Sequence, residues 1–220
     1  MKLLLPATAG FFLAATALAQ APLPVVDVDH GDWGRLRQQC RRLTQAAEKR
    51  TFLNKESIRS LRTRVDKEPA NSAEAVLAVQ KLLDPFCLIG VTINPESRVK
   101  VARGPGEARL TKDKDTFFLV KVHNEAGVTA GLGVSGPQVI SKETAGDGRW
   151  LEADVVGQAP LAARLLGQRL EYVVLRLRPH EAGKREATLK FDVGQGSQDL
   201  GFRAEVPILF QVQEKSGGTP

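Results

Sequence analysis

Cysteine and histidine are scarce in this 220-residue sequence, which contains two Cys and three His. Two cysteines are too few for a small domain held together by several disulfides. Glycine and proline, at 20 and 12 residues, are too rare for a collagen-like chain, and 42% hydrophobic content excludes a disordered one. We find no internal repeat of solenoid or propeller period. The composition is that of a globular protein with one large or two small domains.

Long apolar runs are also absent, except at the start of the chain. Lys2 precedes an apolar run from Leu3 to Leu18, and Ala17-Leu18-Ala19 has the small-x-small pattern of a cleavage site. A membrane anchor is the alternative, but the run is shorter than the ~20 residues that a transmembrane helix needs. We therefore predict a signal peptide over residues 1–19. The mature protein is expected to be exported, periplasmic or extracellular, without a transmembrane segment.

Export would place the two cysteines, Cys40 and Cys87, in an oxidising compartment. We predict a disulfide between them, because two thiols without a third most simply form one bridge. In the chain-entropy model, closing a loop of about 48 residues stabilises the folded state by about 4 kcal/mol. The alternative is that both cysteines stay reduced and pack as small hydrophobic side chains.

After a lead segment over residues 20–31, residues 32–84 follow a helical period. Asp32 is a candidate N-cap for the first helix, whose apolar side chains recur at spacings of three and four. Such spacing places them on one face. These apolar residues are Trp33, Leu36, Cys40, Leu43 and Ala47.

Two further helices are predicted before the period changes. One begins near Asn54 and ends before Pro69. Asn71 and Glu74 form a capping box that opens another, and Pro85 closes it. We therefore expect two or three helices packed in a small antiparallel cluster.

From residue 86 to residue 212 the hydrophobic period is two. Short β-branched runs are separated by turn sequences, with no helical segment between them. We predict an antiparallel immunoglobulin-like β-sandwich of seven to nine strands, followed by a flexible tail over residues 213–220. The fold class is α+β, with the helical cluster preceding the sandwich. The clearest strand runs are Leu88–Ile93, Phe117–Val122 and Tyr172–Leu177.

Positive charge is concentrated in the helical region. Between Trp33 and Lys67 there are eleven basic and three acidic residues, whereas nineteen of each follow Lys67. A one-sided basic surface attracts anions at long range, so we expect an anionic polysaccharide, a membrane surface or an acidic protein as partner, and no nucleic acid. The alternative is that these cations only keep exposed helical faces solvated. The candidate anion-binding residues are Arg41, Arg42, Arg59 and Arg62.

Motifs for catalysis and cofactor binding fail when their context is considered. Gly131–Gly136 has the letters of a dinucleotide-binding fingerprint, but Pro137 follows it and no helix is predicted there. Ser135 lacks the nucleophile-elbow pattern because position 137 is proline. We interpret these glycines as sites of a bend or bulge, and we predict no catalytic residue and no cofactor.

Metal ligands are not indicated either. His30, His123 and His180 lie far apart, and none has another His or Cys at ligand spacing. Asp192 and Asp199 flank a glycine-rich turn, where calcium binding is the alternative to ordinary hydrogen bonding within the turn. We therefore predict no metal site.

Three stretches of the β region carry a family resemblance. They are Leu88–Val101, Phe118–Thr129 and Asp199–Phe210. Together they resemble the region that precedes the catalytic domain in exported bacterial CehA/McbA-like metallohydrolases of the PHP type. The resemblance covers about residues 83 to 212 and implies an accessory sandwich. In that family the metal ligands, mostly His and carboxylates, lie in a later domain, so the resemblance assigns no ligand to this sequence.

These observations favour an exported, non-catalytic interaction or accessory module that acts through its basic helical region. A first alternative is a part of a secreted metal-dependent hydrolase whose catalytic domain is not in this chain. A second alternative is a purely structural partner domain.

Overall fold

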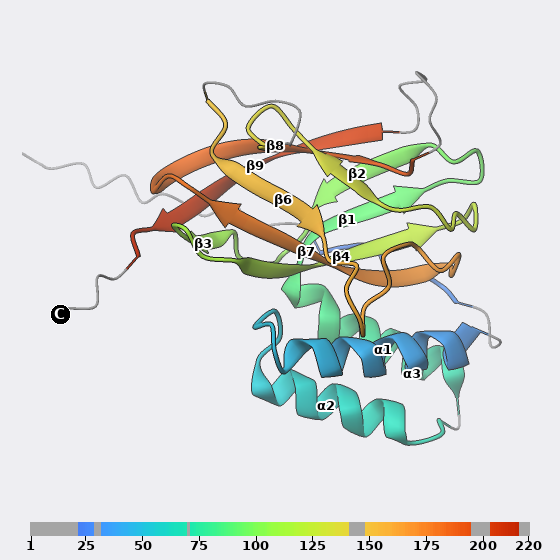
Figure 1. Cartoon of the computed structure of the whole chain (residues 1–220). Helices are drawn as coiled ribbons and strands as arrows, with labels where there is room; N and C mark the ends of the chain where they lie inside the picture. Colours follow the sequence, from blue (N-terminus) through green and yellow to red (C-terminus); the bar gives the residue numbers. More distant parts are fainter. Residues whose placement is uncertain (1–21, 29–31, 70, 141–147, 195–202, 216–220) are drawn as a thin grey trace, which may run out of the picture.

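Three layers of secondary structure build the fold: a group of helices and two β-sheets (Figure 1). The structure is a computed structural model that describes residues 22–28, 32–69, 71–140, 148–194 and 203–215. The predicted α+β class is confirmed. The predicted signal peptide, His30 and Asp199 lie outside the described residues.

The helical layer contains α1 (Trp33–Ala47), α2 (Lys55–Asp66) and α3 (Ser72–Leu83), followed by a short 3₁₀ turn over Asp84–Phe86. The predicted cap at Asn71 is confirmed, because its side chain accepts backbone hydrogen bonds at the start of α3. Asn54, near which the second helix was expected to begin, caps α2 in the same way. Asp32 precedes α1, but its side chain makes no capping hydrogen bond. Among the described residues, no helix has both the length and the apolar character needed to cross a membrane.

The two sheets contain nine strands within the described residues. Sheet A has the order β2-β1-β4-β7-β6 and sheet B has the order β3-β9-β8-β5. The strands are β1 (Cys87–Ile93), β2 (Val99–Arg103), β3 (Arg109–Thr111), β4 (Thr116–Asn124), β5 (Gly133–Ser135), β6 (Leu151–Val155), β7 (Leu170–Pro179), β8 (Gly183–Asp192) and β9 (Arg203–Gln213). The three strand runs identified from the sequence correspond to β1, β4 and β7.

The prediction of a wholly antiparallel sandwich is wrong, because both sheets are mixed. β1 pairs in parallel with β4, with Val91 opposite Val122. β3 pairs in parallel with β9, with Leu110 opposite Val212. Each parallel pair joins strands that are not consecutive in the chain, so strands and loops form the crossover in place of a helix. Because no helix lies between these strands, the sequence pattern did not indicate that they pair in parallel.

Sheet A has apolar side chains on both faces, because it lies between the other two layers. On β7, Leu175 and Leu177 pack into the core between the sheets. Tyr172 and Val174 point to the opposite face and pack into a second core with the helices, which also contains Leu119 of β4. The helical region and the β region therefore share one continuous layered structure.

Residues 22–28 form an N-terminal strap against α3, β1 and β4. The amide of Gln80 makes two buried hydrogen bonds with Val26: it accepts from the backbone N–H at 2.8 Å and donates to the carbonyl at 2.9 Å. Leu23 packs on Gly90, where an added Cβ would lie 2.6 Å from a Leu23 methyl carbon. The ammonium group of Lys121 on β4 also donates to a backbone carbonyl of the strap. The strap is therefore an ordered part of the fold.

The predicted disulfide between Cys40 and Cys87 is wrong, because both residues are free thiols in the structure. Both are wholly buried in the core between the helices and sheet A. Burial raises the pKa of the Cys40 thiol to about 12 and that of Cys87 well above its usual value. Oxidation proceeds through the thiolate, which this environment disfavours. The two cysteines pack as small hydrophobic side chains, as in the alternative interpretation.

Candidate functional site

A groove of about 740 Å³ lies between α2 and α3, and we call it the α2–α3 groove. Figure 1 shows α2 as the helix farthest from the sheets. One wall runs from the middle of α2 to the first residue after it and is formed by Arg59, Ser60, Thr63, Arg64 and Lys67. The other wall and the floor include Pro69, Asn71, Glu74, Ala75 and Ala78. Cationic, hydroxyl and small apolar side chains thus meet in one open surface feature.

The period of α2 explains why these side chains meet. Leu61 and Val65 are wholly buried and hold α2 against the other helices. Arg59, Thr63 and Lys67 follow one another at a spacing of four, so they lie on one face, and all three are exposed. The apolar stripe therefore places the basic wall on the surface.

The cations of the groove differ from most of the basic residues on α1 in being unpaired. The side chains of Arg59, Arg64 and Lys67 make no ion pair or hydrogen bond with any residue in the described part of the chain. The two carboxylates of the groove already have partners. Glu68 pairs with Arg37 of α1, and Glu74 accepts a hydrogen bond from Asn71 at 3.3 Å. Asn71 is neutral, so Glu74 keeps its negative charge, but three unpaired cations against this one carboxylate leave the groove positive.

The structure separates the four arginines selected from the sequence, and only Arg59 lines the groove. Arg41 donates to the carbonyl of Val65 at 3.2 Å and lies 3.6 Å from the Asp66 carboxylate. Arg62 pairs with Glu48. These pairs fasten α1 to α2. Sequence reasoning missed Arg64 and Lys67 as groove residues, although the spacing from Ser60 and Thr63 could have indicated them.

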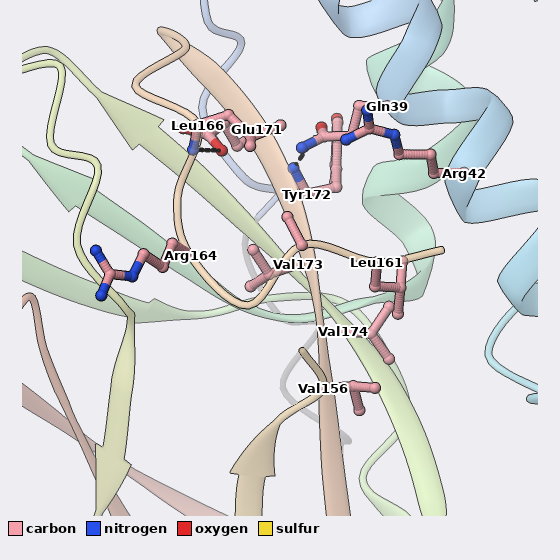
Figure 2. Close-up of a pocket in the computed structure, with 11 residues that line it drawn as sticks. Gln39, Arg42, Val156, Leu161, Arg164, Leu166, Glu171, Tyr172, Val173 and Val174 are labelled. Carbon is pink, nitrogen blue, oxygen red and sulfur yellow. Dashed lines mark hydrogen bonds between the residues drawn. The ribbon is translucent and has the colours of Figure 1, made fainter. Parts of the chain in front are cut away.

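Arg42 lies elsewhere, at the junction between α1 and β7 that Figure 2 shows. The backbone N–H of Tyr172 donates to the side-chain carbonyl of Gln39 at 2.9 Å. Arg42 lines a small hollow beside this bond, together with Glu171. The hollow has an accessible volume of about 20 Å³, which is room for one water molecule rather than for a ligand. Arg42 therefore does not contribute to the α2–α3 groove.

Glu171 holds the loop before β7 in place. It is 1% exposed, and its carboxylate accepts hydrogen bonds from the backbone N–H groups of Leu166 and Gln168, at 2.7 and 3.0 Å (Figure 2 shows the first). Burial raises the pKa of Glu171, and these hydrogen bonds act in the opposite sense. Neighbouring backbone groups satisfy the hydrogen-bonding capacity of this buried carboxylate, so its role is structural.

A second cluster of charged residues lies on sheet A. It is on the face that packs against the helices, beyond the side chains that contact them. Next to Val174 on the same face of β7, Arg176 forms an ion-pair network instead of packing on a helix. It contacts Asp154 at 2.7 Å, Asp115 at 2.9 Å and Glu152 at 3.1 Å. Hydrogen bonds and charge from Asp154 above all raise the pKa of Arg176. Arg176 thus has three carboxylate partners, whereas the cations of the groove have none among the described residues.

His180 extends this network at the end of β7. Its Nδ1 lies 2.9 Å from an oxygen of Asp113 and its Nε2 lies 2.8 Å from an oxygen of Glu152. Both ring nitrogens are therefore engaged with carboxylates, and neither is turned toward a free space as a proton acceptor for a substrate would be. His123 is opposite Leu170, at the other end of β7. The structure thus does not bring His123 and His180 together.

The glycine motif belongs to sheet B. Gly133–Ser135 forms β5, which pairs with β8. A Cβ at Gly136 would lie 2.1 Å from the carbonyl oxygen of Thr188, so close backbone approach accounts for this glycine. Asp192 accepts from the N–H of Gly194 at 3.1 Å, the turn hydrogen bonding expected as the alternative to calcium. Within the described ranges, no group of three or more His, Cys, Asp or Glu side chains is arranged to hold a metal ion.

Comparison with models of protein families finds no match to this chain, and comparison with curated proteins finds none. The resemblance to the region that precedes PHP-type metallohydrolases therefore stays a prediction from the residues alone. A function for this chain has to be inferred from the geometry and charge of the groove.

Proposed function

We propose that this protein is an exported, non-catalytic interaction module that binds an anionic partner in the α2–α3 groove. The observation that carries the proposal is the set of three cations, Arg59, Arg64 and Lys67, which line one groove and lack ion-pair partners in the described part of the chain. Paired cations such as Arg62 are already neutralised within the protein. Unpaired cations on a concave surface attract and hold an external anion.

Export and the absence of catalysis are parts of the same proposal. The apolar run from Leu3 to Leu18 with its small-x-small end supports export. The engagement of both nitrogens of His180 supports a non-catalytic role for the Arg176 network. An immunoglobulin-like arrangement of the two sheets is part of this proposal too, and the α+β class, with two stacked sheets, supports it.

The strength of the expected interaction follows from the exposure of the groove. Each ion pair at a solvated surface contributes about 0.2 to 1 kcal/mol. Three such pairs give weak binding to a compact anion and useful binding only to a partner that engages several cations at once. Binding should weaken as salt increases, because solvent-exposed charges are screened.

The proposal is tested with two variants that remove the same number of positive charges. The groove variant carries Arg59→Ala, Arg64→Ala and Lys67→Ala. The matched control carries Arg35→Ala, Arg41→Ala and Arg62→Ala, which are residues paired with Asp32, Asp66 and Glu48. Binding of fluorescent poly-glutamate is measured for both, at about 20 mM and about 200 mM salt.

The expected result is a loss of affinity of about tenfold or more in the groove variant and little change in the control. Binding by the wild-type protein should also weaken at the higher salt concentration. Equal losses in the two variants would show that overall charge, not the groove, attracts the anion. Salt-independent binding would likewise overturn the proposal.

A further inference from the structure

The two walls of the α2–α3 groove have different chemistry. The α2 wall carries the three unpaired cations and the hydroxyl groups of Ser60 and Thr63. The α3 wall offers Ala75 and Ala78, which are half-buried and three residues apart, so they lie on one face of α3. Helix α3 has only two charged residues among its twelve, Glu74 and Lys81. The groove is therefore basic on one side, and on the other it offers small apolar side chains beside Asn71 and Glu74.

Small side chains on a helix allow another helix to approach closely. Distances between packed helix axes depend on the side chains at the contact, and small ones such as alanine permit short distances. The α2 side of the groove lining runs from Arg59 to Lys67, about 12 Å at a rise of 1.5 Å per residue. This length suits an additional helix of about two turns.

The other anionic partners expected from the sequence fit the groove less well. A sugar ring packs well on a flat aromatic face, and the residues that line the groove include no aromatic. A membrane-binding surface needs large apolar side chains beside its cations. In the described part of the chain, the large exposed apolar residues are Val25, Ile140, Leu166 and Leu209, and none is in the helical layer.

We infer that the anionic partner is an acidic amphipathic α-helix of another protein, which lies in the α2–α3 groove as an added helix of the helical layer. This inference rests on the proposed function and names its partner. The apolar stripe of the partner packs on Ala75 and Ala78. Its carboxylates lie along one flank and pair with Arg59, Arg64 and Lys67.

The positions of the charges in the groove also determine which flank of the bound helix should carry its carboxylates. Arg59 and Lys67 are eight residues apart, which is about 12 Å along a helix axis. Carboxylates seven or eight residues apart on the partner match this distance. Glu74 lies on the opposite wall and repels a carboxylate placed there. An acidic flank is therefore favoured only on the side of α2.

The test uses two synthetic peptides of about four helical turns that share one composition of Glu, Ala and Leu. In the first, Ala and Leu form one stripe and Glu occupies one flank. In the second, the same residues are distributed evenly around the helix. Binding of each labelled peptide is measured by fluorescence anisotropy, and helix formation by circular dichroism. The ordered peptide is expected to bind about tenfold more tightly and to become helical when bound.

A matched pair of protein variants tests whether the peptide lies in the groove. Ala78→Trp fills the groove and leaves its cations in place, whereas Ala73→Trp adds the same side chain at an exposed site of α3 outside the groove lining. The first variant should lose affinity for the ordered peptide about tenfold, and the second should retain it. Thermal unfolding of each variant checks the fold, and Ala75→Gln replaces Ala78→Trp if the latter is unfolded.

The outcomes separate this inference from the proposed function. Equal binding of the two peptides, or full binding by Ala78→Trp, would overturn the helical partner. So would tighter binding to polygalacturonate or to phosphatidylglycerol vesicles than to the ordered peptide. If the variant without the three groove cations still lost its affinity for poly-glutamate, the proposed function would stand without the helix. If that variant bound every anion normally, both would fail.

Discussion

Lys121 and Asp84 form an ion pair inside the protein, with 2.7 Å between Nζ and Oδ2. The side chain of Lys121 is 4% exposed, and its ammonium group also donates to the carbonyl of Pro24 in the N-terminal strap at 2.7 Å. Asp84 accepts a second hydrogen bond from the hydroxyl of Tyr172 at 2.9 Å. This pair therefore links the end of α3, two strands of sheet A and the strap.

Replacing Lys121 with Met should destabilise the protein by about 3 kcal/mol, because the half-buried carboxylate of Asp84 then lacks its cation. Burial already raises the pKa of Asp84, and Lys121 opposes that rise. Urea unfolding measures the change. Lys190→Met is the control, since Lys190 and Glu205 form an exposed pair that contributes at most about 1 kcal/mol. Equal unfolding midpoints for the two variants would contradict a stabilising role for the pair.

Replacing Gln80 with Met should loosen the N-terminal strap. The variant keeps the length of the side chain but leaves the N–H and C=O of Val26 without their partners. The expected cost is about 2 kcal/mol, from two buried hydrogen bonds. Limited proteolysis should cleave near residues 22–28 sooner than in the wild type. Gln45→Met, at an exposed site of α1, is the control, and identical cleavage rates in both variants would refute the strap as an ordered element.

Cys40 and Cys87 should remain reduced in purified protein. Both thiols are buried, and the pKa of Cys40 is raised to about 12, so a thiol reagent at neutral pH should react only after unfolding. The unfolding midpoint should be the same with and without a reductant. A fall in the midpoint upon reduction would mean that the bridge forms after all.

The Arg176 network should make the protein less stable in acid. Burial tends to raise the pKa of Glu152, but hydrogen bonds from His180 and Arg176 outweigh it and hold the pKa below its ordinary value of 4.5. A carboxyl group with a lowered pKa stabilises the fold above the unfolded value, and that stabilisation is lost as pH falls through the folded value. Glu152→Gln should therefore reduce the loss of stability below about pH 4.5.

The control for this pH prediction is Glu186→Gln. Glu186 is exposed on β8 and has no ion-pair partner within the described ranges. Unfolding free energies measured across the acidic range should fall in parallel for this control and the wild type. A Glu152→Gln profile that also ran parallel to the wild type would show that the network does not titrate with folding.

Local signals predicted much of the fold. The helix start near Asn54, the cap at Asn71 and the period-two runs in β1, β4 and β7 each depend on residues close together in the chain. Strand order and the two parallel pairings depend on contacts between distant segments, and no local pattern carried them. The same difference between local and long-range information explains why the disulfide prediction for Cys40 and Cys87 was wrong. Their number and predicted compartment indicated a bridge, whereas the apolar core around them holds two thiols.

The candidate site was found only in outline from the sequence. Clustering of cations between Trp33 and Lys67 correctly located the basic helices, because composition depends only on the chain. Which arginines remain unpaired depends on the acids that neighbouring segments supply. Glu48 pairs with Arg62 and Asp66 pairs with Arg41, so two of the four selected arginines already have ion-pair partners within the protein.

The amino-acid sequence by itself located the helical segments, the strands β1, β4 and β7, and the concentration of positive charge in the first third of the chain. It could do so because periodicity, capping and composition are local properties. Only the tertiary structure decided that α2 and α3 enclose a groove, that Arg59, Arg64 and Lys67 line it without partners among the described residues, and that sheet A is mixed. These features arise when segments far apart in the chain pack together, and packing selects which charges meet a partner.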